Sequence, residues 1–322
     1  MSSNETAVSI VVVSDYGGRT ADDWRYLRAT LEALNQQAFD GRVEVLLADA
    51  APPGQEMPPD LATLVPSARV LRDPALASTE LLNSAVDAAS AELVVMLDGD
   101  CAAVPEWLQA AVDAMRRHPD AAAVSGLTAY PYTSFRNRVL ATLSRSFLDP
   151  GRAGPTRFIS TNNVIFRRDV LRAHPLGPLV RAMAMRMQSE AIRLDGGVLY
   201  FEPRMRVTHR FEGWPMERRI RRNIGYRAIR IRQLDPRIPY SWMVRLGPLS
   251  IPAVLSARIL ESCWNCVRAG SHYGLRWFEL PAAFATAFAV HMLEVRGMRA
   301  AFDEARSAER AAERSAARAA QP

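Results

Sequence analysis

Two carboxylates, Asp98 and Asp100, stand two residues apart directly after an apolar run in this 322-residue chain. The run, residues 93–97, has the length and continuous apolar character of a buried central strand. Open α/β sheets bind ligands at the carboxyl ends of their strands, and a turn at Gly99 would let both side chains face one point. Carboxylate oxygens suit Mg²⁺ or Mn²⁺, which bridge nucleotide phosphates. The motif therefore predicts a metal-nucleotide site, and a simple polar turn is the alternative interpretation.

The elements that would position this motif alternate between strands and helices. No G-x-G-x-x-G segment follows the first strand and no P-loop motif occurs, which argues against a dinucleotide site and a P-loop NTPase. The order predicts an α/β fold with a mostly parallel, Rossmann-like sheet. Strands are expected at residues 7–14, 43–48, 68–71, 93–97, 121–126, 198–201 and 207–209, helices at 24–34, 78–89 and 105–117, and an irregular segment at 130–155.

The charge of the chain suits anionic partners. All 40 basic residues are arginine, against 34 acidic residues, and the formal net charge is +6. Any phosphate contact must therefore use arginine, backbone N–H groups or a metal. Nucleic acid is not an expected partner, because no recognition motif or interleaved aromatic pattern is present. The first residues lack a secretory signal pattern, so the expectation is a cytoplasmic protein, at the inner face of the membrane if it is attached there.

Three cysteines are too few for a disulfide framework. Cys263 and Cys266 have C-x-x-C spacing in a helix-like stretch, and Cys101 follows the acidic motif. No second Cys or His pair has zinc-ligand spacing. We interpret Cys263 and Cys266 as buried thiols, and a redox site, for which C-x-x-C is the usual spacing, is the alternative interpretation.

The chain after residue 203 is basic and then apolar. Residues 204–232 hold ten arginines against two glutamates, which predicts a basic amphipathic helix. Its charged face could be merely solvated, could contact diphosphate, or could dock on anionic lipid. Residues 245–293 predict a helical hairpin whose apolar runs are too short to span a bilayer, so it either packs on the preceding domain or lies in a membrane interface.

Five segments, in order, resemble the nucleotide-sugar glycosyltransferases of the GT-A fold, family 2. They are VVVSDYG, VEVLLADAA, LLNSAVDAASAELVVMLDGD, STNNVIFRRDVL and LYFEPRMRVTH, and together they cover roughly residues 7 to 235. The resemblance implies an inverting, metal-dependent transfer of a sugar from a nucleoside diphosphate to the hydroxyl of a glycan or lipid-linked acceptor. It implies nucleotide-sugar contacts by Tyr16, Asp49, Asn83 and Asp98, and a Mn²⁺ or Mg²⁺ ion held by Asp100 with Asp98 and His209.

One departure from the family pattern concerns the general base. Inverting members carry an Asp on the helix before the strand at 198–201, which here falls near Met185, where no carboxylate stands. The nearest is Glu190, about one helical turn later, which we take as the candidate base. An ion pair of Glu190 with Arg186 or Arg193 is the alternative interpretation.

Two further departures leave other functions open. Leu82 stands where arginine is usual, and Ala50-Ala51-Pro52 replaces Asp-Gly-Ser. A degenerate, non-catalytic sugar-nucleotide or membrane-binding module is therefore an alternative. A nucleotidyltransferase is a second, although residues 15–18 make a poor Gly-rich basic loop for one.

The expected domain organisation follows the resemblance. Residues 1–236 form the catalytic domain, with a nucleotide-sugar part at about 1–100 and an acceptor part at about 101–236. Residues 237–300 form a helical region at or near the membrane interface, and 301–322 form a charged helix or tail.

Overall fold

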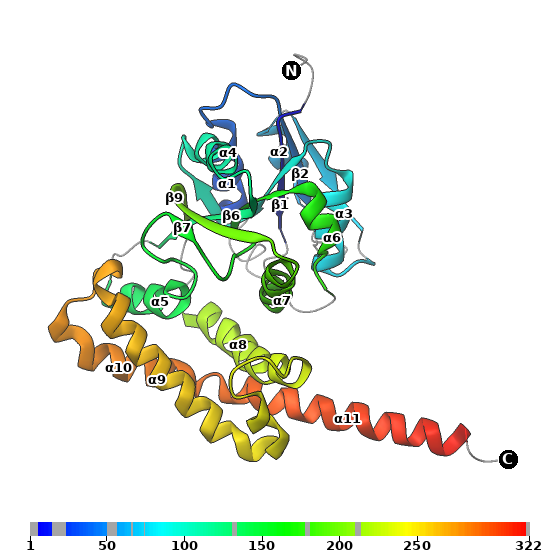
Figure 1. Ribbon diagram of the computed structural model, residues 1–322, viewed down its shortest axis with the longest axis vertical. Helices are drawn as coiled ribbons and strands as arrows, with labels where there is room; N and C mark the ends of the chain where they lie inside the picture. The colour runs from blue at the N-terminus through cyan, green and yellow to red at the C-terminus, as the bar shows by residue number, and fades with distance from the viewer. Residues whose placement is uncertain are drawn as a thin grey trace. The chain divides into compact units, whose positions relative to one another are not determined.

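The protein is described by a computed structural model that covers residues 6–14, 24–49, 57–65, 67–73, 75–130, 134–177, 181–209 and 214–319. The chain divides into two compact units (Figure 1). The first, the α/β unit, comprises Met1–Pro131 and Ser144–Phe211; the second, the helical unit, comprises Tyr132–Leu143 and Glu212–Pro322. The domain boundaries expected from the sequence stay a prediction.

The α/β unit is built on a nine-stranded sheet, with β7 (Gly154–Pro155) pairing with β9 beside the main path. The order along that path is β3-β2-β1-β4-β8-β6-β9-β5. The first four strands in the chain, β1 (Val8–Val13), β2 (Val43–Ala48), β3 (Ala68–Leu71) and β4 (Leu93–Asp98), are mutually parallel. Their apolar, β-branched residues favour buried parallel strands. The predicted Rossmann-like, mostly parallel α/β fold is confirmed.

The other half of the sheet is mixed. β8 (Asn163–Arg167) lies antiparallel between β4 and β6 (Ala121–Ala129), β9 (Val198–His209) runs parallel to β6, and β5 (Cys101–Ala103) is antiparallel to the end of β9.

The expectation of two strands separated at Pro203 was wrong, because β9 continues through it. Glu202 pairs with Gly126 and Arg206 with the next residue of β6, so residues 203–205 form a bulge. A bulge tolerates proline, since its residues need not donate to the ladder.

Helices cover both faces of the sheet. Ile10 and Val12 of β1 join one apolar cluster with α1 (Arg25–Asn35) and α4 (Trp107–Arg117). Val11 and Val13 join the other, with α3 (Ser78–Ala88), α6 (Arg168–Ala173) and α7 (Arg181–Leu194). Because alternate strand residues point to opposite faces, this separation produces a three-layer core. The short helix α2 (Pro59–Thr63) lies beyond β2 in the chain.

The helical unit contains long helices joined by short 3-10 turns. The predicted basic helix is α8 (Trp214–Leu234), and the predicted hairpin is α9 (Ile251–Ala269) with α10 (Leu280–Met292). The 3-10 segments are η1 (Ser241–Ser250), η2 (Gly270–Tyr273) and η3 (Trp277–Glu279), and α11 (Val295–Ala319) ends the described chain. Helices α8 and α11 pack closely, since a Cβ on Gly297 would overlap the carbonyl oxygen of Arg222.

Residues 135–145, expected to be irregular, form helix α5 (Phe135–Arg145). Its 11 residues are fewer than an isolated helix needs to be stable in water, so propensity alone gives a weak signal. Val139 is buried in a cluster with Cys266, Leu275 and Ala283 of the same unit. Tertiary packing therefore stabilises a helix that the local sequence does not predict.

A buried ionic cluster ties the helical unit together. Glu294, fully buried, accepts hydrogen bonds from Arg258 Nε at 2.8 Å and Nη2 at 3.2 Å, and from Arg221 Nη1 at 3.5 Å. His291 Nδ1 lies 3.0 Å from the same carboxylate. Its Nε2 lies 2.7 Å from the hydroxyl of Ser262. The cluster joins α8, α9 and the ends of α10 and α11.

Two stretches of the described chain, Ser241–Tyr273 and Trp277–Ser307, are long and apolar enough to cross a membrane by length and composition. The uninterrupted runs in the sequence did not indicate this. Only 22% and 28% of their most apolar windows are buried. Core helices of soluble proteins, which pass the same test, are mostly buried. The outward faces of α9 and α10 therefore remain uncovered within the described chain.

Candidate active site

The carboxylates of Asp49 and Asp98 lie at the same edge of the sheet. Strands β2 and β4 flank β1, and Val13 is level with both Ala48 and Asp98. Neighbouring strands lie about 4.8 Å apart, so the ends of β2 and β4 are separated by about 10 Å. This distance leaves room for a ligand that spans the end of β1, as expected at the carboxyl edge of a parallel sheet.

Asp49 is buried and held by its surroundings. Its carboxylate accepts a hydrogen bond from Ser14 Oγ at 3.0 Å and one from the backbone N–H of Met57 at 3.2 Å. The guanidinium of Arg72 lies 3.5 Å away. A carboxylate fixed in this way keeps one orientation at the strand end.

A tight turn at Gly99 leads from Asp98 to Asp100. The Gly99 N–H donates to the carbonyl of Val13 at 2.9 Å, and a Cβ added at Gly99 would lie 2.8 Å from that oxygen. Glycine is therefore required at this position by close backbone approach rather than by its φ angle. The turn carries Asp100, which is 5% exposed, directly into β5.

His209 reaches Asp100 because β9 ends beside β5. Cys101 and His209 are direct partners in this antiparallel pair, and His209 Nε2 lies 3.1 Å from Asp100 Oδ2. The thiol of Cys101 donates to Asp100 Oδ1 at 3.5 Å. One ligand atom from each of these three residues lies within 4.8 Å of the others.

The charges in this group determine its protonation. Burial disfavours the charged form of His209, but Asp100 and Tyr130 together outweigh burial and raise the pKa of the imidazole to about 10. Burial, together with the charges of Asp100 and Asp98, raises the pKa of the Cys101 thiol well above its usual value. Without a bound cation the group therefore holds an Asp100–His209 ion pair and a neutral thiol.

The donor set of Asp100, Cys101 and His209 fits a divalent cation. It brings together carboxylate, imidazole and sulfur donors from two strands in a buried position, with Asp98 two residues away. Metals bind protein sites through these donor types. Bound there, a cation would replace the imidazolium proton as the positive charge beside the carboxylates.

Tyr130 and Arg145 also belong to this group, although the sequence did not indicate either. Arg145 Nε and Nη2 lie 3.2 and 3.0 Å from the Tyr130 hydroxyl, and the Tyr130 and His209 ring centroids are 5.1 Å apart. Burial opposes the charge of Arg145, but Tyr130, Cys101 and Asp98 raise its pKa. The position of Tyr130 at the end of a strand could have indicated that it belongs to the site. Arg145 gave no such indication, because it lies in the segment that was expected to be irregular.

Asn83 uses its amide within the protein. Its Nδ2 donates to the carbonyl of Leu176 at 2.8 Å, and its Oδ1 accepts from the N–H of the same residue at 2.9 Å. This pair anchors the segment after α6 to α3. Tyr16 lies outside the described residues. Roles for both in donor binding stay predictions.

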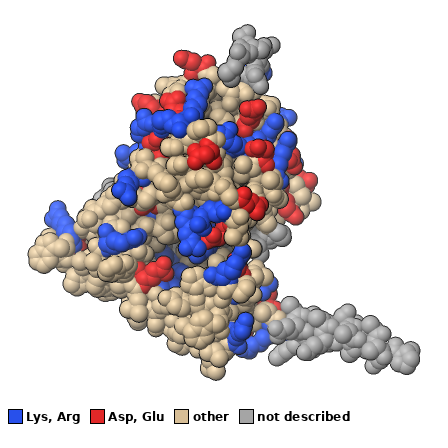
Figure 2. Space-filling view, viewed as in Figure 1, with Lys and Arg blue, Asp and Glu red and all other residues tan. Residues whose placement is uncertain are grey.

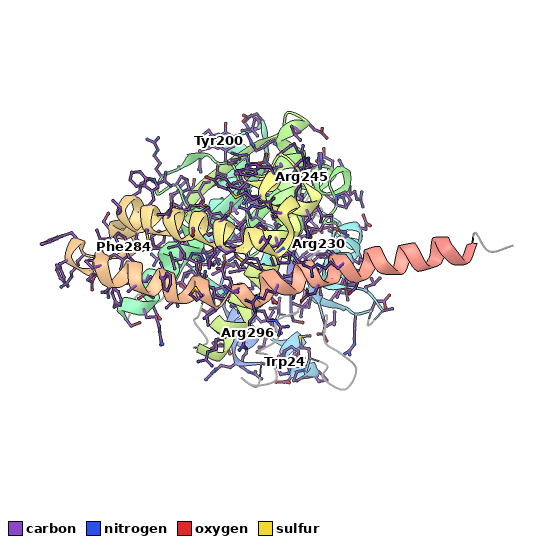
Figure 3. All side chains as sticks on the ribbon, turned by 90° about the horizontal axis from the view of Figure 1, so that it is seen from below. Trp24, Tyr200, Arg230, Arg245, Phe284 and Arg296 are labelled. Carbon is purple, nitrogen blue, oxygen red and sulfur yellow. The ribbon has the colours of Figure 1, made fainter. Side chains whose placement is uncertain are left out.

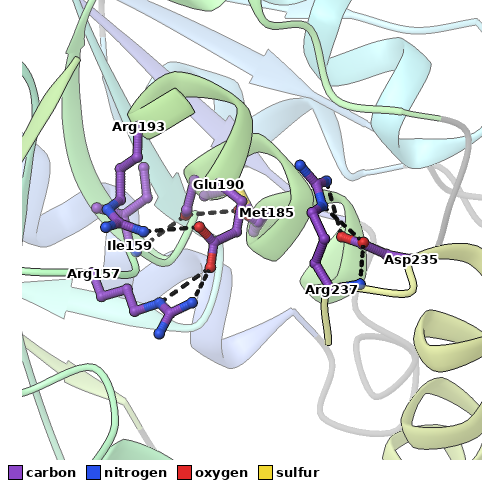
Figure 4. A network of polar contacts seen from close by, with 8 residues as sticks. Arg157, Ile159, Met185, Glu190, Arg193, Asp235 and Arg237 are labelled. Carbon is purple, nitrogen blue, oxygen red and sulfur yellow. Dashed lines mark hydrogen bonds and ion pairs between the residues drawn. The ribbon is translucent and has the colours of Figure 1, made fainter. Parts of the chain in front are cut away.

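Glu190, the candidate base, is a half-buried residue of α7 and lies between Arg157 and Arg193 (Figure 4). Its Oε1 accepts from Arg157 Nε and Nη2 at 3.1 and 2.7 Å, and its Oε2 accepts from Arg193 Nη1 at 2.8 Å. Met185 is buried in the apolar cluster on that face of the sheet. Arg186 instead stacks over Phe158, at 4.7 Å from the ring centroid. Both Glu190 oxygens are thus engaged.

Comparison with known proteins identifies the family. The sequence profile of glycosyl transferase family 2 matches residues 12–174, just over half of the chain. The chain belongs to glycosyl transferase family 2. The predicted resemblance is thereby confirmed, and this glycosyltransferase takes a nucleotide-sugar donor and an acceptor. No curated protein matches the chain in sequence.

The matched region of the glycosyltransferase covers part of the site only. It includes Asp49, Asn83, Asp98 and Asp100 but ends before α7. The roles expected for Glu190 and His209 are therefore supported only by the order of the sequence motifs and by the geometry of the site.

Proposed function

We propose that this glycosyltransferase moves a sugar from a nucleoside-diphosphate sugar to an acceptor hydroxyl, with a divalent metal and with inversion at the anomeric carbon. The observation that carries the proposal is the contact between Asp100 and His209 just after the strand that ends in Asp98, supported by the family match, which includes both aspartates. A hexose is the proposed sugar, and a glycan or lipid-linked hydroxyl the proposed acceptor.

Donor binding would use the acidic strand ends and nearby arginines. Asp49 would accept hydrogen bonds from the nucleotide base, and Asp98 would contact the ribose or donor sugar. The chain contains no lysine, so positive side-chain charge must come from arginine. Arg145, beside Tyr130 and within the electrostatic reach of Asp98, is the proposed diphosphate contact.

Asp100 and His209, with Asp98, would hold Mn²⁺ or Mg²⁺. The bound cation would neutralise the charge that develops on the departing diphosphate. Asp100 would keep its carboxylate oriented through the Gly99 turn, and His209 would give up its proton to become a neutral ligand.

Glu190 is the proposed general base, and it would take the proton of the acceptor hydroxyl as that oxygen attacks. To do so it must free one oxygen from Arg157 or Arg193. Arg157 can leave the Glu190 carboxylate because its side chain is 64% exposed and can turn into solvent. The acceptor hydroxyl would then take its place beside the freed oxygen.

Thermal unfolding with UDP, GDP, CDP and dTDP, each with and without Mn²⁺, tests the proposal. A ligand that binds only the native state should add about 2.7 kcal/mol at 100 times its Kd. We expect a metal-dependent shift with one nucleotide, its loss in Asp100→Ala, and its retention in the exposed control Asp87→Asn on α3. No shift with any nucleotide would favour a non-catalytic module.

We also propose that the helical unit docks on an anionic membrane surface, at the inner face of the cell membrane. Every exposed residue of α10 is apolar, and Phe288 and Met292 are among them. On α9, Leu260, Trp264 and Val267 are exposed. Helices α9 and α10 lie side by side in Figures 1 and 3, and the surface over them in Figure 2 is largely uncharged.

We propose that these helices dock in the plane of the interface rather than cross. Although the stretches Ser241–Tyr273 and Trp277–Ser307 are long enough to cross, α9 carries Arg258, Glu261 and Arg268, and charged side chains in a bilayer core are costly. The second stretch is charged from Glu294 onward, and its apolar helix α10 has 13 residues and is about 20 Å long, shorter than the ~30 Å hydrocarbon core. Residues 212–322 hold 18 arginines against 10 acidic residues, and arginines near an anionic surface each contribute about 1 kcal/mol. The predicted contact segments, 204–232 and 245–293, supply much of this charge and the apolar face.

Vesicle co-sedimentation tests the docking surface. We expect binding to vesicles with anionic lipid, weaker binding to neutral ones, and loss of both in Leu260→Glu/Trp264→Glu. Asn35→Glu, exposed on α1 of the other unit, is the control and should bind normally. Equal binding by wild type and the double variant would refute the proposal.

A further inference from the structure

Cys101 is buried, and it also lies next to two other residues that can bind a metal, Asp100 and His209. It opens β5 opposite His209, and residues directly opposite in an antiparallel pair point to the same face with Cβ atoms about 5 Å apart. Asp100 immediately precedes it. The two-strand pairing therefore builds a group of three donors rather than leaving an isolated cysteine beside a carboxylate.

The surroundings of Cys101 differ from those of the other buried cysteine. Cys266 is packed with Val139, Leu275 and Ala283, as expected of a structural thiol. Cys101 is likewise a buried member of an apolar cluster, but its Sγ–H also donates to the Asp100 carboxylate at 3.5 Å. A sulfur directed at a metal-binding carboxylate is available for coordination.

We propose that Cys101, rather than Asp98, is the third protein ligand of the metal held by Asp100 and His209, and that the site consequently prefers Zn²⁺ or Co²⁺ to Mg²⁺. On binding, the thiol proton passes to solvent and a sulfur–metal bond replaces the S–H bond. Sulfur and imidazole ligands favour these metals, whereas Mg²⁺ prefers oxygen. Three protein ligands leave coordination positions open for diphosphate oxygens. The inference rests on the metal site of the proposed function.

Cobalt titration of the full chain, with a thiol-free reductant, provides the test. A thiolate bound to Co²⁺ gives a charge-transfer band in the near ultraviolet, which oxygen and nitrogen ligands do not. We expect this band in the wild type and its loss in Cys101→Ser, with at least about tenfold weaker Co²⁺ binding. Mg²⁺ binding should change much less in the same variant.

A second variant keeps the test decisive if Cys101→Ser fails to fold. In Cys263→Ser/Cys266→Ser, Cys101 is the only thiol, and we expect the band to remain. A band lost in this variant would assign the sulfur ligand to the C-x-x-C pair and overturn the proposal. Co²⁺ binding without a band in the wild type would also overturn it, while leaving the metal-nucleotide site intact. No binding of Co²⁺ or Mn²⁺, with or without nucleotide, would overturn both.

Discussion

Replacement of Glu294 by glutamine is expected to destabilise the helical unit strongly. The Glu294 carboxylate is fully buried and faces Arg221 and Arg258, with side chains 3% and 21% exposed. Removal of one partner from a buried ion pair typically costs about 3–5 kcal/mol, because the remaining charge stays buried without compensation. Two arginines would lose their counterion here, so the cost should lie within or above that range.

The pKa of Glu294 leads to a similar magnitude. Burial raises it, but Arg258 and His291 outweigh burial and lower the pKa to about 2, from an ordinary value of 4.5. One pKa unit corresponds to about 1.4 kcal/mol, so the charged form contributes about 3 kcal/mol. Because the folded pKa is the lower one, this contribution is present above about pH 4.5 and is lost as the pH falls toward 2.

Hydrogen exchange measured by mass spectrometry can test this value within the helical unit. Peptides from α8 to α11 should exchange roughly a hundredfold faster in Glu294→Gln at neutral pH. The difference between wild type and variant should shrink as the pH falls below about 4.5 and should disappear near pH 2. Glu261→Gln, at an exposed position on α9, is the matched control and should exchange like the wild type.

Unchanged protection in Glu294→Gln at neutral pH would refute the reasoning. It would mean that Arg221 and Arg258 find solvent or other partners at little cost, and that the cluster is not a buried network in solution.

Three further predictions concern the crossing of α8 with α11 and the active site. Gly297→Ala should destabilise the helical unit by about 1–3 kcal/mol in the same exchange assay, because its Cβ would overlap the Arg222 carbonyl; Gly177→Ala, with open space around it, should have little effect. Glu190→Gln should lower turnover in steady-state kinetics and leave donor affinity nearly unchanged, whereas full turnover would exclude it as the base. Arg145→Gln should weaken nucleotide-diphosphate binding by about 1.5–3 kcal/mol in titration calorimetry, and an equal loss of nucleoside binding would contradict a diphosphate contact.

The parallel half of the sheet could be predicted closely because its signals are local. β2 and β3 have the predicted bounds, and β4 differs by one residue. Each is a short apolar run bounded by polar or turn residues, and burial on both faces enforces that pattern. The position of Asp98 and Asp100 at a strand end followed directly from the same runs.

The composition of the site could not be predicted in the same way, because it depends on pairing between distant segments. Nothing near Cys101 in the sequence indicates that it lies opposite His209, more than 100 residues later. Arg145 reaches Tyr130 through a helix that is stabilised by packing rather than by propensity. The arginine contacts of Glu190 were foreseen only for Arg193, since Arg157 comes from outside the helix.

The bulge at residues 203–205 also determines which way His209 faces. Before the bulge, Leu199 lies in the apolar cluster on one face of the sheet; after it, Met205 and Val207 lie in the cluster on the other. An odd number of inserted residues inverts the alternation of a strand. The residues after the bulge keep their own register with β6 and with β5, which places His209 opposite Cys101. The bulge therefore lets one strand supply Leu199 to the core on one face of the sheet and His209 to the candidate site on the other, so the two ends of β9 can vary independently.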